Sequence, residues 1–115
     1  MLVNKYNEKQ ITKNFNLIEY HCRCGQRHKT RFNKELFDLL QKNRDRINEP
    51  IYILSGHRCQ EHNKKEGGVK NSKHITGWAA DIYCGSMNAK QLMAKLKGFD
   101  YMYTKTKVVH VQLNR

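Results

Sequence analysis

Ser72-Lys-His-Ile-Thr-Gly-Trp-Ala-Ala-Asp81 is the stretch that decides the fold of this 115-residue chain. Its end runs into Trp78-Ala-Ala-Asp-Ile-Tyr83, whose alternation predicts a β-strand with alanine and isoleucine on the core face. Asp81 then projects from the opposite face. Gly77 lets the backbone turn just before the strand, so that His74 can lie back over this carboxylate. The stretch therefore predicts a histidine and an aspartate on one surface of a sheet.

A second strand is predicted near the C-terminus, at Val108-Val-His-Val-Gln-Leu113. Alternation places His110 and Gln112 on the face opposite the core. If this strand lies near the first, His110 and Asp81 project from the same surface. Two histidines and one carboxylate with an open fourth position are typical of a catalytic zinc site. Taken singly, each residue has a simpler role, as a surface or core histidine or as a capping or ion-paired aspartate.

The chain outside these strands predicts an α+β domain in which a small antiparallel sheet packs against two helices. Its length suits one domain covering residues 1–115. The further expected elements are an irregular N-terminal wrap over residues 1–31, a helix capped by Asn33 and running to about Ile47, a strand over Ile51–Leu54, a short helical turn and loop over residues 57–73, a helix capped by Asn88 and stopped by Gly98, and a hairpin of residues 99–103 and 107–113.

The charge balance is strongly basic, with 22 Lys and Arg against 10 Asp and Glu and a net charge of +12. Such a charge favours polyanions, whether nucleic acids, acidic membranes or anionic wall polymers, but a compositional bias toward lysine produces the same balance. The basic residues are scattered, which argues against a dedicated nucleic-acid arm. No apolar run approaches the ~20 residues of a membrane span, and residues 1–10 lack the hydrophobic segment of a secretion signal.

Four cysteines, Cys22, Cys24, Cys59 and Cys84, leave several states open. They can form two disulfides, belong to a metal site, or remain free thiols. Free thiols are the default in a reducing compartment. A structural zinc held by the first three cysteines and one of His21 or His28 is an alternative.

The stretch over residues 72–81 matches the pattern S-x-H-x-x-G-x-A-x-D and so resembles the zinc D-alanyl-D-alanine peptidases, the M15 group, whose fold is shared with the Hedgehog signalling domain. Further segments resemble the group in the same order and at similar spacing. They are Phe15 through Gly25, Ser55-Gly-His-Arg-Cys59, His62-Asn63, Gly67-Gly68 and Val108-Val-His-Val111. The resemblance therefore spans nearly the whole chain.

This resemblance implies that His74, Asp81 and His110 bind one zinc ion per chain. It also implies that Arg58 lies beside the metal, where it would hold a substrate carboxylate or stabilise an oxyanion. Ser72 would lie at the rim as a hydrogen-bonding support for substrate. The implied reaction is hydrolysis of a peptide bond in peptidoglycan, by a D,D- or L,D-carboxypeptidase or an endopeptidase of the endolysin type.

Two positions depart from the pattern of many members of the group. Lys107 and Gln112 flank His110 where an acidic residue is common, so no general base is evident. Asp100, His57 and His62 are the remaining candidates for that base. A catalytically degenerate relative, which keeps zinc as a binding or structural module, is therefore the alternative function.

The expected setting follows from these observations. We expect a monomer that acts on peptidoglycan or its stem peptides, with no membrane span and no specific nucleic-acid partner. Because no signal peptide is readable, we expect synthesis in the cytoplasm and action at the cell wall after release. This setting is compatible with a phage or bacterial lysis enzyme.

Overall fold

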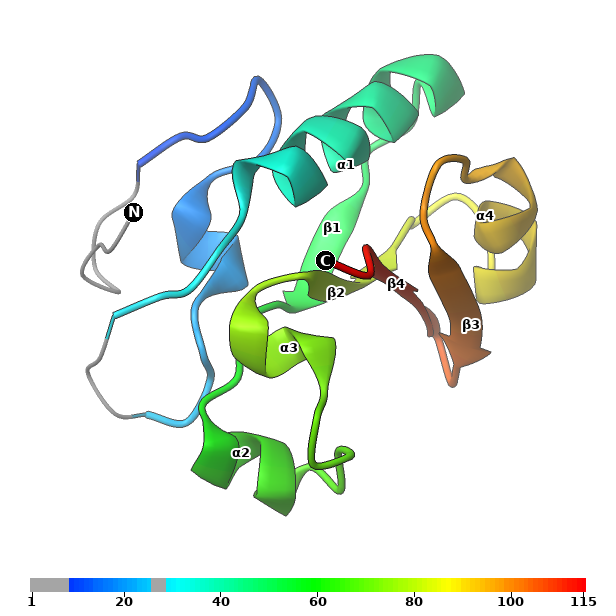
Figure 1. Cartoon of the computed structure of the whole chain (residues 1–115). Coiled ribbons are helices and arrows are strands. Elements are labelled where there is room, and N and C mark those ends of the chain that lie inside the picture. The colour runs from blue at the N-terminus through cyan, green and yellow to red at the C-terminus, as the bar shows by residue number, and fades with distance from the viewer. Residues whose placement is uncertain (1–8, 26–28) are drawn as a thin grey trace.

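The computed structural model describes residues 9–25 and 29–115, and its framework is a four-stranded antiparallel sheet (Figure 1). The strand order is β1-β2-β4-β3. The strands are β1 Tyr52–Ser55, β2 Ala79–Tyr83, β3 Tyr101–Lys105 and β4 Val108–Gln112. The two inner strands, β2 and β4, are almost wholly buried, because each has a neighbour on both sides and packed side chains on both faces.

Helices pack around this sheet (Figure 1). They are the 3-10 helix η1 Leu17–Tyr20 and the α-helices α1 Lys34–Ile47, α2 Gln60–Lys65, α3 Lys73–Thr76 and α4 Ala89–Lys95. The predicted α+β class is confirmed, and α1 and α4 are the two helices that the sequence indicated. No helix in the described ranges is long and apolar enough to cross a membrane.

Two shorter elements differ from the sequence expectation. The residues before β2, expected to be a loop, contain α3, and the middle of the predicted N-terminal wrap contains η1. Each has only four residues, so neither can show an apolar repeat that a sequence pattern would reveal. Residues 1–8 and 26–28 of that predicted wrap lie outside the described residues.

The apolar core is formed by one face of the sheet together with buried side chains of α1, η1 and α4. Phe37 of α1 and Tyr20 of η1 meet edge to face, with ring centroids 5.2 Å apart. The Tyr20 hydroxyl donates a hydrogen bond of 2.5 Å to the carbonyl of Ala79, at the start of β2. Tyr20 is fully buried, and this burial raises the pKa of its hydroxyl far above the usual value. One buried ring therefore ties the N-terminal segment to the sheet.

The strand register decides which polar side chains meet on the other face. Asp81 of β2 is paired with His110 of β4, and His110 is paired with Tyr103 of β3. Directly paired residues in an antiparallel sheet have Cβ atoms about 4.5–5.5 Å apart. The predicted neighbourhood of Asp81 and His110 on one surface is thus built into the register.

Candidate metal centre

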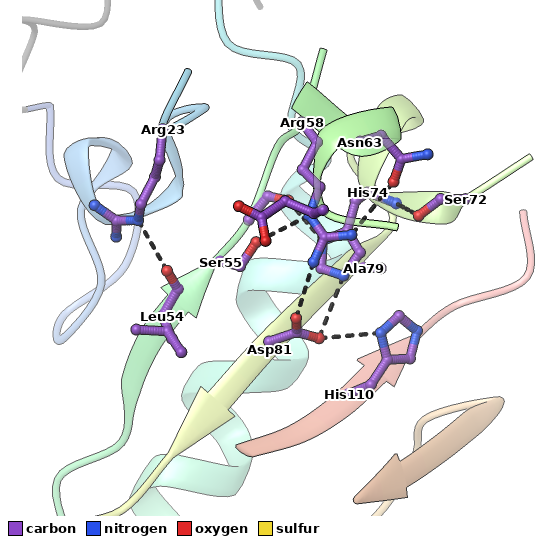
Figure 2. Close-up of polar contacts among 12 residues, drawn as sticks. Arg23, Leu54, Ser55, Arg58, Asn63, Ser72, His74, Ala79, Asp81 and His110 are labelled. Carbon is purple, nitrogen blue, oxygen red and sulfur yellow. Dashed lines mark hydrogen bonds and ion pairs between the residues drawn. The ribbon is translucent and has the colours of Figure 1, made fainter. Parts of the chain in front are cut away.

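Three buried side chains from three elements converge on one point (Figure 2). His74 Nε2 from α3 lies 3.2 Å from Asp81 Oδ1 on β2, and His110 Nδ1 from β4 lies 3.1 Å from the same oxygen. Nitrogen and oxygen ligands at about 2.05 Å from a tetrahedral zinc ion lie about 3.3 Å apart. The structure thus brings together the three residues proposed from the sequence, at a spacing that suits zinc.

The position of His74 is fixed by the ends of the short helix α3. Ser72 caps its N-terminus, and its hydroxyl accepts a 3.2 Å hydrogen bond from the His74 backbone N–H. Gly77 ends the helix with a φ of 81°, and a Cβ there would lie 2.7 Å from the Arg31 carbonyl oxygen. The Asn33 side chain donates a 3.0 Å hydrogen bond to the Gly77 carbonyl. The predicted turn at Gly77 is therefore also a close contact with the segment before α1.

Each imidazole has its second nitrogen engaged by the protein. His74 Nδ1 donates to the Gly56 carbonyl at 2.7 Å, and His110 Nε2 donates to the Gln112 side-chain oxygen at 2.7 Å. The lone pairs of His74 Nε2 and His110 Nδ1 therefore face Asp81 Oδ1. Metal-binding histidines typically show this second hydrogen bond, which fixes the tautomer and the ring orientation. A cation is needed where two lone pairs and a carboxylate oxygen converge, and a zinc ion fits this donor set.

Arg58 holds the other oxygen of the same carboxylate. Its Nη2 donates to Asp81 Oδ2 at 3.2 Å, and the ion pair is almost completely buried. Its Nη1 donates to Asn63 Oδ1 and its Nε to Ser55 Oγ, both at 3.3 Å. Arg58 therefore lies beside the candidate centre, the position that the resemblance to the M15 group implies for it, and orients Asp81.

The carboxylate is charged despite its burial. Burial alone would raise the pKa of Asp81, but its contacts with the His110 and His74 rings outweigh burial and hold the pKa well below its usual value. An ionised carboxylate is the form that binds a metal ion.

Aromatic contacts also fix the His110 ring. Tyr103 stacks on it with ring centroids 4.6 Å apart and 18° between the planes. The His74 ring meets it edge to face at 5.1 Å. His110 is held by a hydrogen bond and by two ring contacts, so the site is preorganised.

Two clefts open beside this centre. One, of about 640 Å³, is lined by His74, His110, Ser72 and both tyrosines of β3, and the other, of about 430 Å³, includes Asp81 in its wall. The residues common to both walls are Arg58, Glu66 and Lys105. The two clefts share these three wall residues and together form one groove. This groove gives access to the candidate metal centre and has room for a peptide.

Glu66 is a site residue that sequence reasoning did not find. Among the described residues that line the two clefts, Glu66 and Asp81 are the two acidic ones. It follows α2, and its carboxylate lies 3.5 Å from His62 Nε2 one helical turn earlier. The His62 and Glu66 spacing of four residues was the available signal, since such pairs share one helix face.

The three base candidates proposed from the sequence lie in different surroundings. Asp100 accepts hydrogen bonds from the Asn114 backbone N–H at 2.8 Å and from Arg115 at 2.7 Å, and these hold it at the C-terminal end of the chain. His57 is buried, and its backbone N–H donates to the Tyr20 carbonyl. His62 lines the smaller cleft with Glu66. The structure thus brings only His62 of the three to a cleft wall.

Comparison with known proteins bears on the family of the chain. No curated protein gave a match. The sequence model described as Peptidase M15 matches residues 13–112, a range that contains Arg58, His74, Asp81 and His110. Because the match covers most of the sequence and the observed α+β fold is compatible with it, the chain belongs to the peptidase M15 family.

Proposed function

We propose that this protein is a zinc-dependent peptidase that hydrolyses a peptide bond in peptidoglycan, as a carboxypeptidase or an endopeptidase. The observation that carries the proposal is the convergence of His74 Nε2, Asp81 Oδ1 and His110 Nδ1 at the wall of an open groove. Membership of the peptidase M15 family, a family of zinc metallopeptidases that act on peptidoglycan-type substrates, supports it.

The three converging side chains would hold one zinc ion and leave a position open toward the groove. When bound, zinc polarises a carbonyl oxygen and lowers the pKa of a bound water to about 7. The contribution of the protein is rigidity, because Gly56, Gln112 and Arg58 orient the three ligands through hydrogen bonds.

We assign to Arg58 the role of binding the substrate. A guanidinium has five N–H donors, and the contacts to Asp81, Asn63 and Ser55 use three of them. Since Arg58 lines both clefts, its remaining donors can bind a substrate carboxylate or the developing oxyanion. Further basic residues line the clefts and favour a peptide with free carboxylates; they are Arg23, Lys73, Lys105 and Lys107.

Glu66 is the group that we assign as general base. Hydrolysis of an amide needs a group that takes a proton from the attacking water and passes one to the leaving nitrogen. Asp81 is engaged by both histidines and by Arg58, whereas the Glu66 side chain is half exposed and lies in both cleft walls. The neighbouring His62 orients the Glu66 carboxylate through their 3.5 Å contact.

The deciding experiment pairs zinc analysis of the purified protein with digestion of purified peptidoglycan and mass spectrometry of the released fragments. We expect bound zinc at the candidate centre and new peptide termini, which identify the bond that is cut. His74→Ala is the control, because removal of one of three ligands abolishes tight zinc binding and cleavage together. Absence of zinc from the wild-type protein would overturn the proposal.

A catalytically degenerate relative is the second candidate function. Lys107 favours it, because this cation lines the smaller cleft beside Asp81, where many M15 relatives have an acid. A zinc-loaded protein that leaves several types of wall uncut would select this candidate. It would then act as a zinc-dependent binding module.

A further inference from the structure

Three cysteines from distant parts of the sequence gather outside the candidate metal centre. Cys22 and Cys24 follow η1, and Cys59 lies at the start of α2. Their sulfur atoms all lie within 4.8 Å of one another. Sulfurs at 2.3 Å from a tetrahedral zinc ion lie about 3.8 Å apart, so shifts of about 1 Å suffice to form a three-sulfur metal site.

Backbone groups already point at two of these sulfurs. The Cys59 N–H donates to Cys22 Sγ at 3.3 Å, and the His62 N–H donates to Cys59 Sγ at 3.4 Å. Hydrogen bonds of this kind stabilise sulfur in its negatively charged form and are common around metal-bound thiolates. Both N–H groups belong to the turn that carries Cys59, so the backbone around the cluster already supplies hydrogen bonds to metal-bound sulfur atoms.

Burial separates this cluster from a reactive redox centre. Cys22 is buried, and Cys24 and Cys59 are half-buried. Buried sulfurs are poorly accessible to an attacking thiol, whereas redox cysteines have accessible sulfurs. A bound cation instead deprotonates a coordinating thiol outright. The surroundings therefore favour a metal ligand over a disulfide-exchanging thiol.

We propose that Cys22, Cys24 and Cys59 bind a second zinc ion, separate from the His–Asp centre. Binding replaces the three thiol protons with three zinc–sulfur bonds, and a water or a further side chain completes the tetrahedron. His21 and His28 are the fourth ligands considered from the sequence. The former contacts Thr30 through Nδ1, and the latter lies outside the described residues.

The zinc would fasten the N-terminal segment to the turn that carries Arg58. Cys22 and Cys59 are 37 residues apart in sequence, and Arg58 immediately precedes Cys59. The Arg58 backbone N–H donates to the His74 carbonyl at 3.1 Å, so this turn also touches the helix of the candidate centre. A metal that closes such a long loop stabilises the fold and restrains this turn.

The test counts zinc in the full chain purified under reducing conditions. We expect two zinc ions per chain in the wild type and one in Cys22→Ser, Cys24→Ser and Cys59→Ser. The matched control is Cys84→Ser, because Cys84 is a buried free thiol outside the cluster, with its sulfur 3.2 Å from Ser86 Oγ. It should keep both ions. Loss of the cysteine-bound zinc should lower the Tm by about 5–10 °C.

Two further measurements keep the result independent of folding and of the proposed function. A mercurial thiol reagent added to the wild type should release one zinc ion per chain, and Co²⁺ substitution should give a sulfur-to-metal charge-transfer band that persists in His74→Ala. Zinc content that is equal in the wild type and in Cys22→Ser, Cys24→Ser and Cys59→Ser, or an intact mass showing a disulfide among these cysteines, would each overturn the proposal. Failure of peptidoglycan cleavage alone bears only on the proposed function.

Discussion

Gln112 departs from the family pattern in the sequence, but its contacts in the structure give it a positioning role beside His110. Its side-chain oxygen accepts from His110 Nε2 at 2.7 Å, and its own amide donates to Asn114 at 2.6 Å. The amide therefore orients the ring of His110 toward the metal position. An acidic residue at this position would accept the same hydrogen bond from His110 and so orient the same ring. The presence of glutamine here is therefore no evidence that a catalytic base has been lost.

Replacement of this positioning residue should weaken zinc binding without unfolding the chain. We expect Gln112→Ala to lower zinc affinity about 10–100-fold, because His110 loses the partner that fixes its tautomer. Gln112→Glu should restore most of the affinity, since its carboxylate still accepts from Nε2. Competition with a chromophoric chelator measures both. Equal affinities in all three proteins would show that Gln112 has no orienting role.

Arg58 should separate zinc binding from turnover. Arg58→Ala should keep zinc at saturating metal but lower kcat about 10²–10³-fold, since it removes the buried guanidinium beside the reacting groups. Arg58→Lys should recover little, because an ammonium cannot reach Asp81, Asn63 and Ser55 together. Steady-state kinetics on a soluble stem peptide, with zinc analysis of the same samples, measures both quantities. Full turnover in Arg58→Ala would remove Arg58 from the reaction.

At the scale of elements, the end of α3 is where backbone conformation supports the site. Gly77 has a φ of 81° and lies against the Arg31 carbonyl, so Gly77→Ala should cost about 1–3 kcal/mol of unfolding free energy. Gly85 is the matched control, because nothing lies within 4 Å of a Cβ built there. Gly85→Ala should stay within about 0.5 kcal/mol of wild type. Urea unfolding of both variants measures these free energies. Equal losses of unfolding free energy in Gly77→Ala and Gly85→Ala would show that the conformation and close contact of Gly77 are not important for stability.

The elements that the sequence could predict are those with a period. Strand alternation placed Asp81 and His110 on one face, and the three-to-four spacing of apolar residues identified α1, because both signals come from a core-facing surface. The short helix α3 and the contact of Gly56 with His74 carry no such signal. Glu66 has a sequence signal in its four-residue spacing from His62, but this spacing does not place it near the site, because its position in the cleft walls follows from how α2 packs.

For the whole molecule, the net charge of +12 gives a prediction about adhesion to the cell wall. A strongly basic protein binds anionic wall polymers through many weak contacts, and salt screens these contacts as the Debye length falls from about 10 Å at 0.1 M to 3 Å at 1 M. We therefore expect the fraction of protein that sediments with isolated sacculi to fall steeply with salt. Such adhesion would hold the protein at the wall.

Charge reversal away from the clefts separates this adhesion from catalysis. Lys90, Lys95 and Lys97 are exposed on and after α4 and are absent from both cleft walls. Reversal of all three to Glu changes the net charge from +12 by three times −2, to +6, whereas the matched triple Lys→Arg variant keeps +12. The reversed variant should sediment less at low salt yet cleave a soluble stem peptide at the wild-type rate. If it sediments as well as the arginine control, the charge is a compositional bias without a role at the wall.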